Sequence, residues 1–173
     1  MWLHVEPTSR CNAWCPSCPR NNRGYGLADI NVLDLDPQRL ASVIKEYNID
    51  NVQMCGNIGD PCAATNINEQ FSVLTGIDKL QIHTNGSLRK PTWWADLVNK
   101  FSKLDVWFAL DGIGDVHSYY RQGTNYNKVI ENAKAFINAG GNAIWQFIPF
   151  VHNEHQIMDC MRLSQELGFK RFE

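Results

Sequence analysis

Short apolar segments alternate along this chain with longer segments in which apolar residues recur every three to four positions. Extended apolar segments predict strands, and the longer period predicts amphipathic helices. The pattern predicts six strands, at about residues 3–5, 51–55, 80–83, 106–110, 143–151 and 169–173. It predicts five helices between them, at about residues 37–47, 66–74, 94–101, 129–137 and 157–167.

A strand followed by a helix, repeated five times and closed by a last strand, is typical of a parallel sheet with right-handed crossovers. Six strands are too few for the closed eight-stranded barrel. We therefore expect an α/β fold, a partial, open (β/α)6-type barrel with parallel strands. No linker or low-complexity segment interrupts the pattern, so we expect a single domain over residues 1–173. Small and polar residues follow the expected strands, where parallel α/β folds place their active sites.

The composition, 44% hydrophobic and 20% charged residues, is that of a folded globular protein. A formal net charge of −2 gives no strong nucleic-acid signal, because non-specific binding to nucleic acid needs a basic surface. No apolar run reaches membrane length and no signal peptide precedes Cys11, so we expect no membrane association. Cys55, Cys62 and Cys160 are scattered and read as small core residues. This cysteine usage favours a reducing, metal-handling compartment, and we expect a cytoplasmic protein.

The most informative motif is Cys11-x3-Cys15-x2-Cys18, directly after the first expected strand. Three thiolates so close together can ligate three irons of a [4Fe–4S] cluster and leave the fourth iron open. Clusters that only carry electrons usually have four cysteine ligands. The alternatives are a structural zinc site and three unrelated thiols, but structural zinc prefers four ligands in paired C-x2–4-C units. The spacing favours the cluster with an open corner.

Together, the motifs at the strand ends resemble those of the radical S-adenosylmethionine (SAM) family. The cysteine loop resembles its cluster motif, and the segment 56–61 resembles its Gly-Gly-Glu-Pro motif. Further similar signatures occur in order along nearly the whole chain, at 84–86, 110–112, 117–123 and 152–156. The resemblance is strongest to the branch that carries a C-terminal twitch or SPASM extension with auxiliary clusters.

The resemblance implies two cofactors, a [4Fe–4S] cluster and SAM, and an electron donor such as a flavodoxin or ferredoxin. It implies that the cluster reductively cleaves SAM to a 5′-deoxyadenosyl radical that abstracts hydrogen from a substrate. It makes Cys11, Cys15 and Cys18 the metal ligands. No catalytic residue is assigned. We expect contacts with SAM from Gly59, Asp60, Pro61, Asn85, Asp111, Arg121, Gln146 and Asn153.

Each of these SAM-contact candidates also has an ordinary structural interpretation. Gly59 and Pro61 would otherwise shape a tight turn, and Arg121, whose planar fork suits a carboxylate, would be a surface side chain. Asn85 would stabilise a turn, while Asp111 and Asn153 would cap the segments that follow them. Gln146 lies in an apolar strand and needs a buried partner, either cofactor or backbone.

The chain departs from the family pattern at three residues and in where it ends. Ser17 stands where an aromatic residue often lies against adenine, a role that Trp14 or another group would have to take. Asp60 replaces the usual glutamate, and Ala109 replaces a frequent serine. The chain ends at Glu173, inside the sixth expected strand, so we expect the auxiliary-cluster extension to be absent.

The substrate is not legible from these motifs, although relatives in this branch often modify a peptide or protein. Two alternatives stay open. The chain could be an activase that installs a glycyl radical on a partner protein, or a truncated, non-catalytic module that only binds an Fe–S cluster and SAM.

Overall fold

The computed structural model describes residues 1–24 and 30–173. Its centre is a six-stranded sheet in the order β1-β2-β3-β4-β5-β6. The strands are Trp2–Val5 (β1), Asn51–Met54 (β2), Lys79–Thr84 (β3), Leu104–Ala109 (β4), Asn142–Gln146 (β5) and Arg171–Phe172 (β6). Every neighbouring pair is parallel, with Val5 opposite Met54 and Phe108 opposite Trp145 in the register. Strands β1 and β6 are the two edges, so the expected open, all-parallel α/β arrangement is confirmed.

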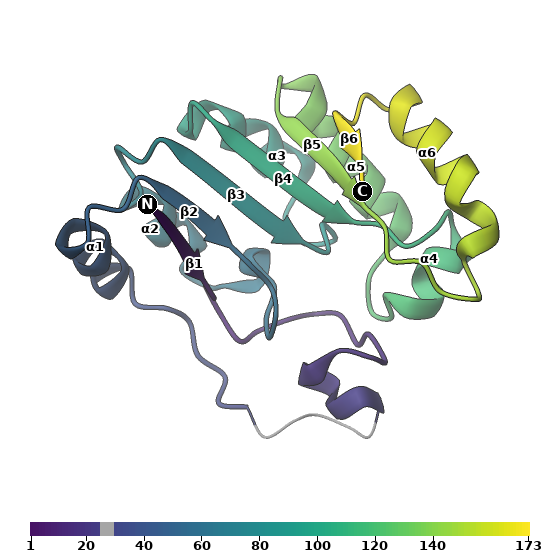
Figure 1. Cartoon of the computed structure of the whole chain (residues 1–173), viewed down its shortest axis with the longest axis horizontal. Coiled ribbons are helices and arrows are strands. Elements are labelled where there is room, and N and C mark those ends of the chain that lie inside the picture. Colours follow the sequence, from purple (N-terminus) through teal and green to yellow (C-terminus); the bar gives the residue numbers. More distant parts are fainter. Residues whose placement is uncertain (25–29) are drawn as a thin grey trace.

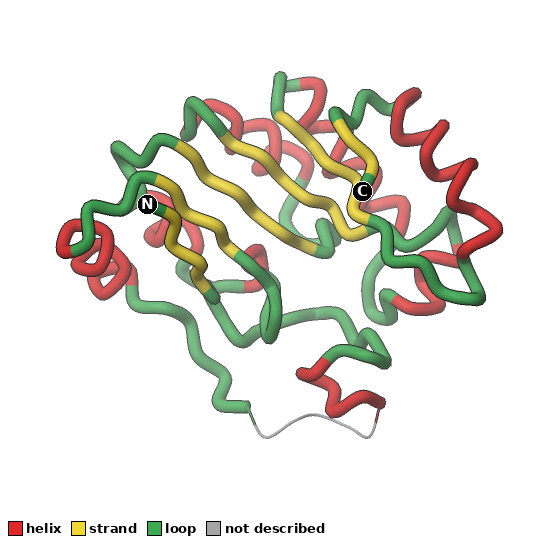
Figure 2. Tube along the Cα trace, viewed as in Figure 1, coloured by secondary structure: helices red, strands yellow, loops and turns green. Residues whose placement is uncertain are grey.

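Helices connect the strands, as Figure 2 shows. The α-helices are Pro37–Glu46 (α1), Ile67–Ser72 (α2), Pro91–Leu97 (α3), Asp115–Tyr120 (α4), Tyr126–Asn138 (α5) and Ile157–Glu166 (α6). Short 3-10 turns lie at Pro19–Gly24 (η1), Pro61–Ala63 (η2), Val98–Lys100 (η3) and Glu154–Gln156 (η4). The predicted start of α1 is confirmed, because the Asp36 carboxylate accepts a hydrogen bond from the Gln38 N–H at 2.9 Å. Within the described residues, no helix has both the length and the apolar character needed to cross a membrane.

The two faces of the sheet differ in polarity. Strand β3 alternates between half-buried and fully buried side chains, with Leu80 and Ile82 buried and Gln81 and His83 half-buried. The buried set packs against helices, and in Figure 1 α2, α3 and α5 lie behind the sheet. The half-buried polar set lines the opposite face, which is turned toward the viewer in that figure. The cysteine loop lies beyond the carboxyl ends of the strands, below the sheet in the same view.

Three elements differ from the sequence-based expectation. Strand β5 ends at Gln146 rather than near residue 151, because Pro149 has no N–H for a strand ladder and the chain turns away from the sheet. Helix α3 ends at Leu97 and continues only as the η3 turn. Helix α4 was not predicted from the sequence. It has six residues, of which His117 alone is buried, so it shows no repeating pattern of apolar residues.

Candidate functional site

Cys11, Cys15 and Cys18 all line one cavity of about 310 Å³ at the carboxyl edge of the sheet. All six cysteines of the chain are free thiols. Apart from the cysteine loop, the cavity walls come from the ends of β2, β3, β4 and β5 and from the end of α4. These wall residues are Cys55, Gly56, Asn57, Ile58, Gly59, Asp60, His83, Thr84, Asn85, Ala109, Arg121, Gln146 and Ile148. The fold therefore brings the cysteine motif together with several of the motif residues that follow it by 40 to 135 positions.

The three thiols of the cysteine loop line one cavity, and the described residues do not converge there as the ligands of a single ion. Among the described residues, no three His, Cys, Asp or Glu side chains converge as the ligands of one ion would. Structural zinc requires such convergence. A cubane cluster offers a separate iron to each thiolate, so its ligands surround it instead of meeting at one point. Three thiols arranged around a shared cavity are compatible with that geometry.

The thiols of Cys11 and Cys15 are hard to ionise in the fold without a bound cation. Burial, and to a smaller extent the nearby Asp60 carboxylate, raises the pKa of the Cys11 thiol to about 12. Burial also raises the pKa of Cys15, while the Arg121 guanidinium opposes that shift. Metal ligation needs thiolates, so binding of iron here displaces protons from both side chains.

Polar side chains fix the cysteine loop to two other strand-end segments. The Asn12 Nδ2 donates to Ser87 Oγ at 2.9 Å and to the carbonyl of Gly123 at 3.2 Å. Asn85 Nδ2 in turn donates to Asn12 Oδ1 at 3.0 Å and lies 3.9 Å from Cys11 Sγ. Gly123 has a φ of +80°, and a Cβ there would lie 2.5 Å from the Asn12 carbonyl oxygen. The loop that bears the cysteines is therefore held from the end of β3 and from the segment after α4.

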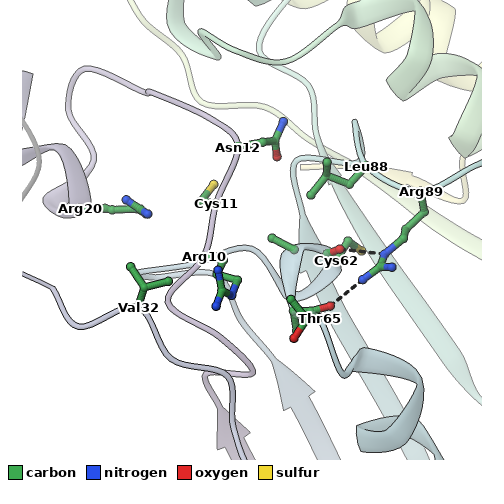
Figure 3. Close-up of a pocket in the computed structure, with 11 residues that line it drawn as sticks. Arg10, Cys11, Asn12, Arg20, Val32, Cys62, Thr65, Leu88 and Arg89 are labelled. Carbon is green, nitrogen blue, oxygen red and sulfur yellow. Dashed lines mark hydrogen bonds between the residues drawn. The ribbon is translucent and has the colours of Figure 1, made fainter.

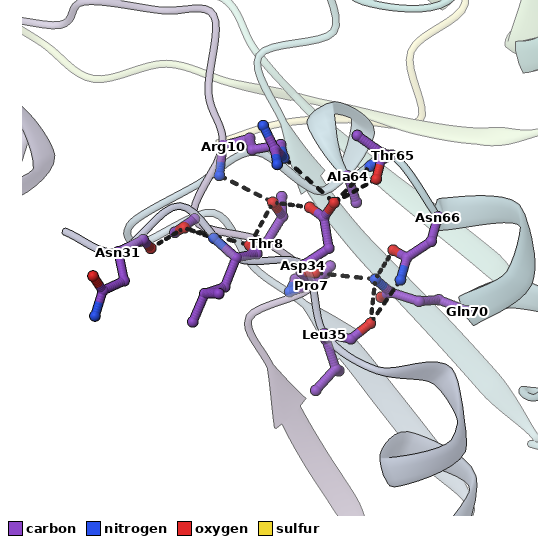
Figure 4. Close-up of polar contacts among 12 residues, drawn as sticks. Pro7, Thr8, Arg10, Asn31, Asp34, Leu35, Ala64, Thr65, Asn66 and Gln70 are labelled. Atoms are coloured by element: carbon purple, nitrogen blue, oxygen red, sulfur yellow. Dashed lines mark hydrogen bonds and ion pairs between the residues drawn. The ribbon is translucent and has the colours of Figure 1, made fainter.

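The base of the cysteine loop is held by the Asp34 carboxylate (Figure 4). It accepts hydrogen bonds from the hydroxyls of Thr8 and Thr65, both at 2.5 Å, and from Arg10 Nε at 3.3 Å. Burial opposes ionisation of Asp34, but the bonds from Thr65, Thr8 and Arg10 outweigh it and lower the pKa of the carboxyl. One charged group thus joins the chain before Cys11 to the segment that precedes α1 and to the start of α2.

Gly59 and Asp60 attach the β2 loop to the same segment. A Cβ on Gly59 would lie 2.0 Å from the carbonyl oxygen of Thr8 and 2.8 Å from that of Arg10, so only glycine permits this approach. The Asp60 N–H donates to the Arg10 carbonyl at 2.7 Å. These contacts set the distance between the β2 loop and Cys11.

The Asp60 side chain is committed to the protein, although the residue forms part of the cavity wall. Its two oxygens accept from the Cys62 N–H at 2.9 Å, from Thr84 Oγ1 at 2.9 and 3.0 Å, and from the Asn85 N–H at 2.6 Å. Burial raises the pKa of Asp60, and these bonds oppose the shift. The Asp60 carboxylate, one methylene shorter than that of a glutamate, thus joins the β2 loop to the end of β3.

Arg121 lines the cavity from the end of α4, and Asp111 holds it from behind. Arg121 Nε donates to Asp111 Oδ2 at 2.6 Å, and the two side chains are 15% and 0% exposed. The other oxygen of Asp111 accepts from the Ile148 N–H at 2.8 Å. Nε is the atom of Arg121 that donates to Asp111, and a hydrogen bond from the Arg121 side chain also lowers the pKa of the Cys15 thiol. The guanidinium is therefore oriented through Nε and lies at the cavity wall near Cys15.

His117 supports this pair in a single tautomer. The Asp111 N–H donates to His117 Nδ1 at 3.2 Å, so Nδ1 carries no proton. Thr124 Oγ1 donates to the Arg121 carbonyl at 2.6 Å and lies 3.0 Å from His117 Nε2, so Nε2–H is the donor there. Burial, reinforced by the charge of Arg121, lowers the pKa of His117 to about 4 and keeps the ring neutral.

The remaining expected site residues are divided between the cavity and its support. Gln146 lines the cavity, whereas Pro61 is buried at the start of η2 and outside the wall. Asn153 is fully buried, and its amide donates to the carbonyls of Asp111 at 3.1 Å and Ile148 at 2.9 Å. Its Oδ1 accepts from the Phe150 N–H at 2.6 Å. Asp111 and Asn153 thus shape the site from outside the cavity wall.

Sequence reasoning missed several contributors to the site. Asn12 lies inside the cysteine motif, and only its position suggested a role. His83 lines the cavity and stacks on Trp107, with ring centroids 4.5 Å apart. The two-residue alternation of β3, which puts His83 on the same face as Gln81, is the signal that would have found it. Asp34 had no such signal, because its partners Thr8 and Arg10 are more than 20 positions away.

No protein-family model and no curated protein sequence matches this chain. Solved structures do match. SuiB of Streptococcus suis, bound to the precursor peptide SuiA, has a TM-score of 0.80 at 19% identity over 99% of this chain and 38% of SuiB. The protein anSMEcpe with bound AdoMet has a TM-score of 0.75 at 18% identity, over 99% of this chain and 50% of its own.

A third match is TYW1 with a lysine–pyruvate adduct, with a TM-score of 0.65 at 13% identity, over 96% of this chain and 61% of TYW1. The chain thus spans between about two fifths and three fifths of the length of these proteins. All three are radical SAM enzymes. The chain therefore has the fold of the radical SAM enzymes, the family that its cysteine loop and strand-end motifs resemble.

Proposed function

We propose that this chain binds one [4Fe–4S] cluster and SAM and forms the catalytic core of a radical SAM enzyme. The observation that carries the proposal is the single cavity that Cys11, Cys15 and Cys18 share with Gly59 and Arg121. When bound, the cluster and SAM supply a 5′-deoxyadenosyl radical, formed by reductive cleavage of SAM, that abstracts hydrogen from the substrate.

The residues of the cavity divide into ligands and positioning groups. Cys11, Cys15 and Cys18 hold the cluster as thiolates. Arg121 binds the carboxylate of SAM through its terminal nitrogens, because its Nε is already bonded to Asp111. Asn85 and Gln146 provide amide groups on the walls for the polar parts of SAM. Gly59 keeps its backbone close to the cysteine loop, so the main-chain carbonyls of the β2 loop would be available to the amino group of SAM.

We propose a peptide or protein as the substrate. The relatives SuiB and anSMEcpe were solved with peptides bound. In this chain, Ile148 forms part of the cavity wall at 37% exposure, and Val151, three residues on in the sequence, is 89% exposed. Tyr119, two residues before the cavity residue Arg121, is 69% exposed and packs against His152 with ring centroids 4.6 Å apart. Exposed aromatic and aliphatic groups close in sequence to residues of a site suit contact with an extended chain.

Cysteine variants test the cluster assignment. Replacement of Cys11, Cys15 or Cys18 by Ala is expected to abolish the visible Fe–S absorbance of the anaerobically reconstituted protein and its dithionite-driven production of 5′-deoxyadenosine. Cys55→Ala is the strictest control, because Cys55 lines the same cavity but lies at the end of β2 with its sulfur 4.0 Å from His4 Nδ1. A normal cluster in all three loop variants, or its loss only in Cys55→Ala, would contradict the assignment.

The substrate class has a separate test. Short peptides encoded beside the gene are incubated with the reconstituted protein, SAM and reductant, and analysed by mass spectrometry. A change in peptide mass that appears in proportion to 5′-deoxyadenosine is expected. Formation of 5′-deoxyadenosine with every such peptide unchanged would count against a peptide substrate and leave the cofactor assignment standing.

A further inference from the structure

A second, wider depression lies next to the cofactor cavity and shares Cys11 with it. This arginine groove, defined by Arg10, Arg20, Arg89 and Cys11, has a volume of about 650 Å³ (Figure 3). The apolar part of its wall comes from Val32, Ala63, Ala64 and Leu88. A thiolate ligand of the proposed cluster thus forms part of the wall of both depressions.

The groove is basic although the chain as a whole carries a formal charge of −2. Its described lining contains three arginines and no carboxylate. Arg89 Nε and Nη2 donate to the carbonyls of Cys62 at 2.9 Å and Ala64 at 2.6 Å, which hold the guanidinium in place without neutralising it. Arg20 Nε is buried and has no partner within the part of the chain that the structure describes. Arg10 is paired with Asp34 at 3.3 Å.

The arginines surround the depression and do not converge on one point. Figure 3 shows Arg20 and Arg89 on opposite sides, with Cys11 and Arg10 between them. A single small anion would need converging donors, whereas separated charges suit an extended acidic surface. Electron-transfer complexes between proteins use small, charge-complementary interfaces of this kind.

We propose that the arginine groove is the docking surface of an acidic one-electron carrier protein that reduces the cluster past Cys11. The inference rests on the proposed function, which requires a reduced cluster. The carrier is oxidised by one electron and the cluster is reduced by one, and no bond forms or breaks. Cys11 lines both the cofactor cavity and the groove, so a carrier in the groove would lie on the other side of this one cluster ligand. Because electron tunnelling weakens steeply with distance, this side is the favoured point of entry.

Charge reversal tests the docking surface in the reconstituted protein. Arg20→Glu and, as a second variant in case it fails to assemble, Arg20→Gln are compared with Arg162→Glu, an exposed arginine on α6 that pairs with Asp159. The probe is a flavodoxin of net negative charge, with its affinity measured by calorimetry at low and moderate salt. The rate of cluster reduction by the reduced flavodoxin is followed by stopped-flow absorbance. Iron content and dithionite-driven SAM cleavage are recorded in parallel.

We expect Arg20→Glu to weaken flavodoxin binding and slow cluster reduction by roughly tenfold at low salt, with a smaller difference at higher salt. Arg162→Glu, iron content and dithionite-driven cleavage should be unchanged. Equal flavodoxin affinity and reduction rate in wild type, Arg20→Glu and Arg162→Glu would overturn the docking surface. Tight binding of inorganic phosphate that Arg20→Glu abolishes, without any effect on reduction, would overturn it in favour of a small-anion site. Failure of the wild type to cleave SAM with dithionite would instead refute the proposed function.

Discussion

Replacement of Asp111 by Asn removes one charge from the buried pair that orients Arg121. The substitution preserves side-chain size and an oxygen that accepts from the Ile148 N–H, so the main change is the loss of the carboxylate facing Arg121 Nε at 2.6 Å. Asp111 is fully buried and Arg121 is 15% exposed, so solvent screens the pair little. Removal of one partner from a buried pair typically costs about 3–5 kcal/mol, because the remaining charge is left unpaired.

We therefore expect Asp111→Asn to lower the free energy of unfolding of the cluster-free protein by about 3 kcal/mol, the lower end of that range. The lower end applies because Arg121 retains some contact with water. The assay is urea unfolding at pH 7, followed by circular dichroism. The matched control is Asp159→Asn in the Asp159–Arg162 pair on α6, whose side chains are 52% and 71% exposed. That change should cost less than about 1 kcal/mol, as surface pairs do.

A double variant distinguishes the loss of the Asp111–Arg121 ion pair from a change in side-chain packing. If Arg121 is destabilising once unpaired, Asp111→Asn combined with Arg121→Gln should recover a large part of the lost stability, because neither charge then remains. SAM binding should not recover, since the guanidinium is gone. A loss below about 0.5 kcal/mol in Asp111→Asn, or additive losses in the double variant, would refute the view that this pair is desolvated and coupled.

Three further changes test other parts of the site. Arg121→Ala should weaken SAM affinity by about 1.5–3 kcal/mol with little change in iron content, as measured by calorimetry; an unchanged affinity would remove Arg121 from the site. Gly59→Ala should reduce iron incorporation and thermal stability, because its Cβ would lie 2.0 Å from the Thr8 carbonyl oxygen; normal values for both would contradict the close approach. His117 has a pKa of about 4 in the fold against 6.5 when unfolded, so its neutral form contributes stability that is complete above pH 6.5 and declines as the pH falls toward 4. This contribution to the free energy of unfolding is about 3 kcal/mol. Urea unfolding between pH 6.5 and 4 should therefore show a shallower loss of stability in His117→Gln than in the wild type; equal losses in the two proteins would assign the pH dependence to other groups.

The period of the apolar residues was enough to predict the sheet. Leu80 and Ile82 alternate with Gln81 and His83. In the structure the first two are buried on the helix-covered face of the sheet, and the other two are half-buried on the polar face. The strand ends followed from the same argument, since parallel strands present their carboxyl ends at one edge. Strand β5 was overestimated because Phe147, Ile148 and Phe150 continue the apolar run, and only Pro149 marks the departure from the sheet.

The parts of the site that belong to a sequence motif could be predicted. The parts that depend on hydrogen bonds between distant segments were harder to predict. The cysteine spacing and Gly59 could be recognised locally. The hydrogen bonds that the Asp60 carboxylate accepts from Cys62, Thr84 and Asn85 could not be predicted from the sequence. Those donors come together only when β2 and β3 lie side by side. The support of Arg121 by Asp111 and His117 likewise depends on the position of α4, which has too few apolar residues to predict.

The contacts at the base of the cysteine loop have a consequence for the entropy of cluster assembly. Ser9 N–H donates to the Leu33 carbonyl and Leu35 N–H to the Pro7 carbonyl, both at 2.9 Å, so protein groups alone join the ends of a 25-residue stretch. Bringing together the ends of a flexible chain of that length costs about 3 kcal/mol. Folding bears this cost, so the base of the cysteine loop is closed whether or not iron is bound, and Cys11, Cys15 and Cys18 lie inside a stretch whose ends are already fixed.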